Sequence, residues 1–134
     1  EKERGVFLNV EGRCSIHTFR PGFCRMFPLG RIYEENDFQY FLQVHECTYP
    51  NKTKVKVKKW LGIPEIYKYE AYIKAWHFFI KDASKIVKET QNDAIIKNLI
   101  MYLLNQFYVK PYEDFYGQFY ERLEEARKVV KLYR

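Results

Sequence analysis

The sequence predicts an α+β fold in which small β-hairpins that carry the cysteines pack beside a bundle of three main helices. Turn formers, aromatic strand-like runs and all 3 cysteines lie in the first fifty residues, whereas long helical patterns fill the rest. With 134 residues, 47% of them apolar and 19% aromatic, the chain is long enough for one domain with a real core and too short for two. We therefore predict a single domain, residues 1–134, with a hairpin region at 1–50 and a helical region at 51–134.

Two β-hairpins are predicted in the cysteine-bearing region. In the first, residues 6–9 and 14–16 flank a turn at residues 11–12, which places Cys14 at the start of the second arm. In the second, residues 31–33 and 38–44 flank a polar turn at residues 34–37. Closing the second hairpin is expected to place the other two cysteines, Cys24 and Cys47, near each other and within range of one ion.

A short helix is predicted next, from an N-cap at Thr53 to a glycine stop at Gly62. Val57, Trp60 and Leu61 would lie on its inner face. The alternation of lysines with other residues from Lys52 to Lys58 equally suits an edge strand, and we favour the helix.

Three longer helices follow, each with an apolar stripe at helical spacing. The first begins near Pro64, the second is capped by Asn92 or Asp93, and the third begins after Pro111 with the acidic pair at residues 113–114. The inward positions of the first are Ile66, Tyr69, Ile73, Trp76, Ile80, Ala83 and Val87. Those of the second are Ile95, Ile96, Leu99, Ile100, Leu103, Leu104 and Phe107, and those of the third are Phe115, Phe119, Leu123, Ala126 and Val130.

Charge and hydropathy exclude some classes of protein. The net charge of +6 comes from lysines and arginines scattered over the chain, a pattern typical of solvated surfaces. The best apolar stretch, residues 95–109, is interrupted by lysine, asparagine and glutamine, so we predict no membrane segment. Three cysteines cannot all pair within the chain and no secretory signal is recognisable, which favours a reducing cytoplasm.

The cysteines and two histidines form the candidate metal site. Thiolate and imidazole are ligands of zinc, and thiolates also hold iron–sulfur clusters. The candidate ligands are Cys14, Cys24 and Cys47, followed by His17 and His45. Cys14 and His17 have the spacing of a zinc chelate on a turn, and His45 would share a face with Cys47 if both lay in a strand. Taken alone, the cysteine spacing matches no common zinc finger and favours buried small hydrophobic residues over metal ligands.

A family resemblance supports the metal interpretation. The order Gly12-Arg13-Cys14-Ser15-Ile16, then Arg20-Pro21-x-x-Cys24-Arg25-x-Phe27-Pro28, then a distant Cys47 resembles the YkgJ-type cysteine-cluster proteins, a zinc- or iron-chelating domain family. The resemblance covers roughly residues 7–61 and implies a metal centre without an assigned reaction. Arg13, Arg20, Arg25 or Arg31 could offset the thiolate charge, although an ordinary surface role is favoured for each of them taken singly. The family carries tyrosine in place of His17, which ranks this histidine below the cysteines.

The resemblance is incomplete at the amino-terminal side. The family has a dense group of upstream cysteines that this sequence lacks, and a further family cysteine would fall at Gly5. The three cysteines therefore resemble the downstream half of a centre whose other ligands have been truncated or lost. The iron–sulfur cluster or zinc ion is accordingly expected to be absent from this segment by itself, or bound incompletely.

Alternative functions stay open. No phosphate-binding glycine loop, nucleophile elbow or zinc-protease motif occurs, so the sequence leaves enzyme activity undecided. The alternative to a metal protein is a basic module, without metal, that binds nucleic acid or an acidic partner through the cluster from Lys52 to Lys59 and Trp60. Lysines on exposed faces and tyrosines at helical spacing are more often structural, so we expect no nucleic-acid partner. An unidentified protein partner, or self-association of the helices, is a further possibility.

Overall fold

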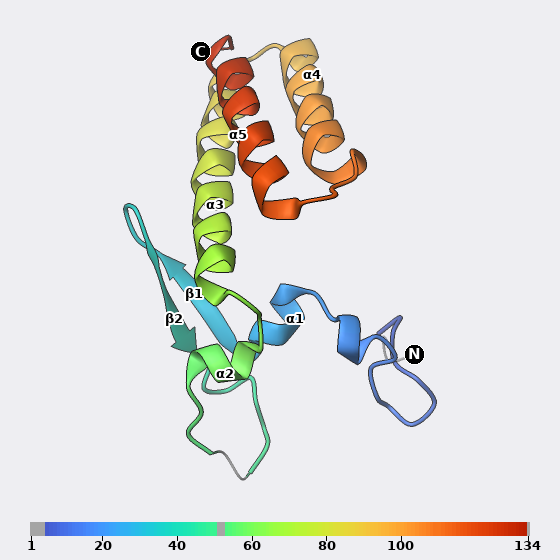
Figure 1. The fold of residues 1–134 in the computed structure, drawn as a ribbon. Coiled ribbons are helices and arrows are strands. Elements are labelled where there is room, and N and C mark those ends of the chain that lie inside the picture. Colours follow the sequence, from blue (N-terminus) through green and yellow to red (C-terminus); the bar gives the residue numbers. More distant parts are fainter. Residues whose placement is uncertain (1–4, 51–52, 134) are drawn as a thin grey trace. The chain divides into compact units, whose positions relative to one another are not determined.

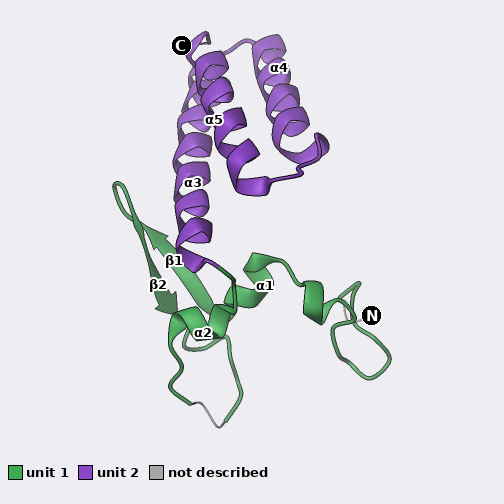
Figure 2. Ribbon diagram, viewed as in Figure 1, with its two compact units in different colours: residues 1–64 green, residues 65–134 purple. Residues whose placement is uncertain are grey.

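The computed structural model describes residues 5–50 and 53–133. It contains helices and one two-stranded antiparallel hairpin (Figure 1), which confirms the predicted α+β class with a helical bundle. The chain divides into two compact units, Glu1–Pro64 and Glu65–Arg134 (Figure 2). Single-domain organisation, with hairpins packed beside the bundle, stays a prediction, and each unit is described by itself. No helix in the described part of the chain is long and apolar enough to span a membrane.

The hairpin of unit 1 pairs β1 (Leu29–Tyr33) with β2 (Phe38–Leu42). Its register runs from Leu29 opposite Leu42 to Tyr33 opposite Phe38. Gly30 faces Phe41, whose ring occupies the space that a Cβ at residue 30 would need. The second predicted hairpin is therefore confirmed, although β2 ends at Leu42 instead of residue 44 because the chain turns at residues 44–46.

The first predicted hairpin is reduced to one bridge between Leu8 and Cys14. Its turn is present, because Gly12 has the left-handed φ of 77° and the Asn9 side chain accepts hydrogen bonds from two backbone amides of the loop. Residues 14–16 do not continue as a strand. A short two-stranded ribbon has little stability without a third strand or a packed face. The chain instead enters η1 (His17–Phe19).

Two short helices complete unit 1, α1 (Gly22–Met26) and α2 (Val57–Leu61). The sequence did not predict α1. The helical interpretation of α2 is confirmed, as is its stop at Gly62, which has φ 59° and donates its N–H to the carbonyl of Lys58. The predicted cap at Thr53 is wrong, because residues 53–56 are irregular and α2 begins after Lys56. Lys52 lies outside the described residues.

Unit 2 consists of α3 (Ile66–Glu89), α4 (Asp93–Leu104) and α5 (Phe115–Lys131), with a π-helical turn, η2 (Asn105–Val109), continuing α4. These are the three predicted main helices. The Asn92 side chain accepts hydrogen bonds from the amides of residues 94 and 95, which confirms the predicted cap. The buried core consists of Phe79, Ala83, Ile86, Leu99, Phe107, Phe119, Leu123, Ala126 and Val130.

The buried faces differ in part from the predicted stripes. All of the inward positions predicted for α5 are buried except Phe115. On α3, Phe79 and Ile86 are buried although neither belongs to the predicted stripe. On α4, Ile100 and Leu104 are 51% and 43% exposed, because the apolar stripe is wider than the face that α3 and α5 cover.

A buried arginine holds the end of α4 and η2 against α5. Arg122 is 5% exposed, and its guanidinium donates hydrogen bonds to the carbonyls of Gln106 and Lys110, each at 2.8 Å, and to that of Pro111. Its Cζ lies 3.8 Å from the centroid of the Tyr112 ring. Carbonyls at the end of a helix lack intrahelical donors. The Arg122 side chain supplies donors to carbonyls at this end and just beyond it.

Replacing Arg122 by methionine should lower the free energy of unfolding of the chain by about 3 kcal/mol, because three carbonyls lose their donor inside the packed unit. Urea unfolding followed by helical circular dichroism measures the change. The matched control is Arg127→Met, which removes an exposed ion pair with Glu124 and should cost less than about 0.5 kcal/mol. Equal losses in the two variants would contradict the role given to Arg122.

Candidate metal centre

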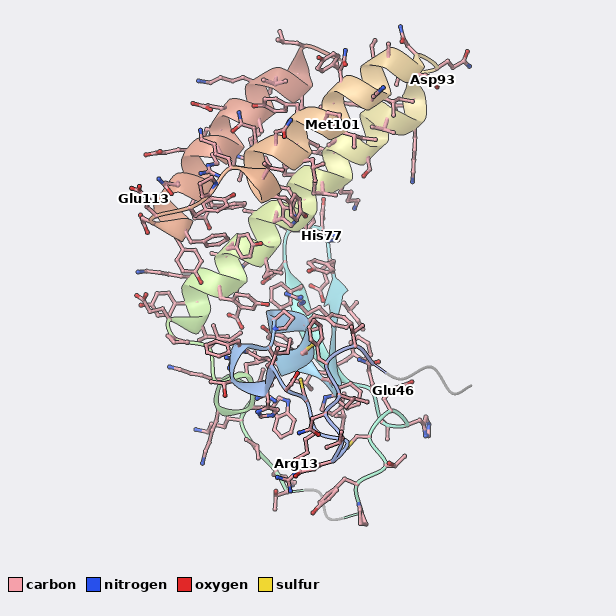
Figure 3. The ribbon with its side chains drawn as sticks, turned by 90° about the vertical axis from the view of Figure 1, so that its right-hand side faces the viewer. Arg13, Glu46, His77, Asp93, Met101 and Glu113 are labelled. Carbon is pink, nitrogen blue, oxygen red and sulfur yellow. The ribbon has the colours of Figure 1, made fainter. Side chains whose placement is uncertain are left out.

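All three cysteines lie in unit 1 and all are free thiols. Cys14 forms the bridge with Leu8, Cys24 lies in α1, and Cys47 follows the turn after β2. Cys14 and Cys24 are exposed, whereas Cys47 is half-buried. Figure 3 labels Arg13 and Glu46, the residues that directly precede the first and last of these cysteines.

The base of the hairpin joins the segments that carry Cys24 and Cys47. The Gln43 amide donates to the Pro28 carbonyl at 3.0 Å, and the Gln43 side chain donates to the Leu29 carbonyl at 3.2 Å. Cys24 lies four residues before Pro28, and Cys47 lies four residues after Gln43. The loop between these two cysteines is therefore closed in the backbone, whereas the approach of both thiols to one ion stays a prediction.

The ligands are not gathered into a formed site. Among residues 5–50 and 53–133, no group of three or more histidine, cysteine or acidic side chains is placed to hold a metal ion. The structure thus places each candidate cysteine in unit 1 without bringing the set together.

His17 has one ring nitrogen engaged. Its Nε2 lies 2.7 Å from a terminal nitrogen of Arg20. A guanidinium has no acceptor, so Nε2 must accept this hydrogen bond and its lone pair is unavailable to a metal in this arrangement. Only Nδ1 of His17 is left as a candidate ligand atom.

His45 lies outside the hairpin ladder. Because β2 ends at Leu42, His45 falls in the exposed turn at residues 44–46. The alternation of side chains along a strand, on which its shared face with Cys47 depended, does not apply there.

The arginines near the cysteines bind carbonyls and rings. The Arg25 guanidinium donates to the carbonyls of Thr18 and Arg20, both at 3.2 Å, and thereby ties η1 to α1. Arg31 lies over the Phe38 ring, with Cζ 5.7 Å from its centroid. The sequence suggested that these charges could offset thiolates and favoured an ordinary surface role for each, whereas the structural role of Arg25 depends on carbonyls that only the folded segment presents.

A cavity of about 690 Å³ adjoins Cys47 and was not predicted. The sequence signal for it is weak, because its walls come from segments far apart in the chain. It is lined by Phe27, Pro28, Leu29, Leu42, Gln43, Cys47, Tyr49, Thr53, Lys54, Val55, Val57 and Trp60.

Comparison with known proteins adds no family assignment. No family model, curated protein or solved structure matches the chain. The resemblance to the YkgJ-type cysteine-cluster proteins therefore stays a prediction.

The burial of the thiols predicts an order of reactivity. In the reduced, metal-free protein, iodoacetamide should alkylate Cys14 and Cys24 several-fold faster than Cys47, because Cys47 alone is half-buried in a cavity wall. Mass spectrometry of peptides taken at intervals gives the three rates. In denaturant the three alkylation rates should converge. This control separates the effect of burial in the folded chain from the intrinsic reactivity of each thiol. A native Cys47 that reacts as fast as the others would contradict the structure of this segment.

Proposed function

We propose that this chain is a metal-binding protein that contributes the thiolates of Cys14, Cys24 and Cys47 to a zinc or iron–sulfur centre. The observation that carries the proposal is that every cysteine of the chain is free and lies in one compact unit. The backbone bond between Gln43 and Pro28, which closes the loop separating Cys24 from Cys47, supports it further. Thiolates bind both kinds of centre, and the reaction, if any, is not assigned.

Metal binding in this unit would be coupled to local ordering. Cys14 is held by one bridge, and Cys47 lies in an irregular segment after a turn, so both thiols can move at little cost in backbone hydrogen bonds. The three cysteines supply fewer than the four protein ligands of a closed zinc site. The proposal therefore includes at least one further ligand, supplied by His17, by His45, by another chain or by a longer form of this chain. Free thiols in these numbers suit the cytoplasm, where disulfides are rare.

The competing proposal is a basic segment that binds an acidic partner. It is supported by the exposure of Lys54, Lys56, Lys58 and Lys59 around the start of α2. Binding of a DNA oligonucleotide that is tight at low salt and weakens steeply as salt rises would favour this proposal. If the oligonucleotide did not bind even at low salt, this competing proposal would be contradicted.

Metal binding is tested on the reduced chain without oxygen, by zinc competition with a chromogenic chelator and by the thiolate charge-transfer absorbance of bound cobalt. Metal content after expression in medium with iron and zinc tests for a cluster. We expect weak zinc binding, because three thiolates leave a closed site one ligand short. Cys24→Ser or Cys47→Ser should weaken that binding by about tenfold or more, because each loses a thiolate ligand. The matched control is Thr48→Ala, beside Cys47, which should leave zinc affinity unchanged.

Two results would contradict the proposal. One is a protein that carries neither iron nor zinc and gives no cobalt–thiolate absorbance. The other is zinc binding of equal strength in the wild type and in all three single cysteine variants, which would place the ion elsewhere.

A further inference from the structure

The cavity of unit 1 has the dimensions of a small-molecule site. Its volume of about 690 Å³ falls inside the range of roughly 300–1,000 Å³ that is typical of ligand pockets. Its walls are the segment before and at the start of β1, the end of β2 with the residues that follow it, and α2 with the segment leading into it. All of these belong to one compact unit, so the cavity is defined within that unit.

Hydrogen bonds hold two walls of the cavity in place. The indole Nε1 of Trp60 donates to the carbonyl of Phe27 at 3.0 Å, which fixes the ring of α2 against the segment before β1. On the other side, Gln43 bonds to the carbonyls of Pro28 and Leu29 and closes the base of the hairpin. The cavity is therefore formed without a ligand, which lowers the entropy lost on binding.

The lining is mostly apolar and largely uncovered. Leu42 is 52% exposed, Tyr49 66%, Val55 44% and Trp60 47%. Large apolar side chains from separate segments thus converge on one cavity while leaving much of their surface in water. Aliphatic and aromatic side chains together form most of this lining, a non-directional surface that suits a hydrocarbon chain.

The polar groups of the lining favour an anion. Lys54 carries the sole charge among the described lining residues, and none of those residues is acidic. The other polar side chains of the lining are those of Gln43, Cys47, Tyr49 and Thr53, and the Gln43 amide already donates one hydrogen bond to the Leu29 carbonyl. An apolar cavity with one ammonium matches a ligand with an apolar body and one negative charge.

We propose that this cavity binds a medium-chain carboxylate, with its hydrocarbon chain against Leu42, Val57 and Trp60 and its carboxylate toward Lys54. The inference is independent of the proposed metal function, because Cys14 and Cys24 do not line the cavity. Cys47 belongs to both the proposed metal site and this cavity. The set of cysteines that a ligand protects from alkylation therefore distinguishes metal binding from carboxylate binding.

The first test is calorimetric titration of the reduced, metal-free chain with decanoate below its micelle concentration. Decanoate should bind saturably at one site, and decyltrimethylammonium, which has the same chain and the opposite charge, should bind at least about tenfold more weakly. Lys54→Gln and Lys54→Glu should each weaken decanoate binding, the second by about tenfold or more. The matched control is Lys56→Glu, at a lysine two residues away that is also exposed but does not line the cavity, and it should leave the affinity unchanged.

The second test is alkylation with iodoacetamide in the presence of decanoate. Decanoate should slow the reaction of Cys47 several-fold and leave Cys14 and Cys24 unaffected, whereas bound zinc should protect all of the cysteines that ligate it. Absence of saturable decanoate binding would overturn the inference. So would equal affinity for the cationic amphiphile, equal loss in the Lys54 and Lys56 variants, or protection by decanoate that does not single out Cys47.

Discussion

The guanidinium of Arg122 sets the arrangement of unit 2 at the point where α4 ends. The chain there passes through a π-helical turn and reverses toward α5, leaving carbonyls that the helix cannot satisfy. The carbonyls of Gln106 and Lys110 at this end, and that of Pro111 just beyond it, accept hydrogen bonds from Arg122, which is almost fully buried and has no acidic partner among the described residues. Burial of a charge is tolerated when fixed dipoles surround it, and the carboxyl end of a helix is the negative end of its dipole.

The aromatic core is assembled around that anchor. Phe107 of η2 lies 5.9 Å from Phe119, centroid to centroid, and Tyr112 lies 4.8 Å from Phe115, so the reversing segment covers the amino-terminal half of α5. Tyr72 of α3 contacts the same rings at 4.7 Å from Phe119, and burial raises its pKa to about 12. Without the bonds from Arg122, the segment that carries Phe107 and Tyr112 would lose its fixed position over this cluster.

Unit 1 is built on a different physical basis. In its described part, Met26 and Leu61 are the buried apolar side chains, so the hairpin ladder, the Arg25 bonds and the Trp60 bond to Phe27 carry much of its order. Small units with little core are commonly stabilised by a bound metal or another added constraint. A metal held by the cysteines and a ligand in the cavity would each provide interior contacts that the apolar side chains of this unit do not provide, and both would engage Cys47.

The local signals of the sequence were sufficient for the fold class, the second hairpin, the stop at Gly62 and the three main helices with the Asn92 cap. Each of these depends on residues within one or two turns of chain, where backbone geometry and capping chemistry act directly. The tertiary structure decided which part of the α4 stripe is covered, that Arg122 is buried among carbonyls, and that Trp60 bonds to Phe27 and lines a cavity with Cys47. These features join residues that are distant in sequence, so no local periodicity or motif encodes them; they arise only when packing and buried hydrogen bonding select one arrangement of the segments.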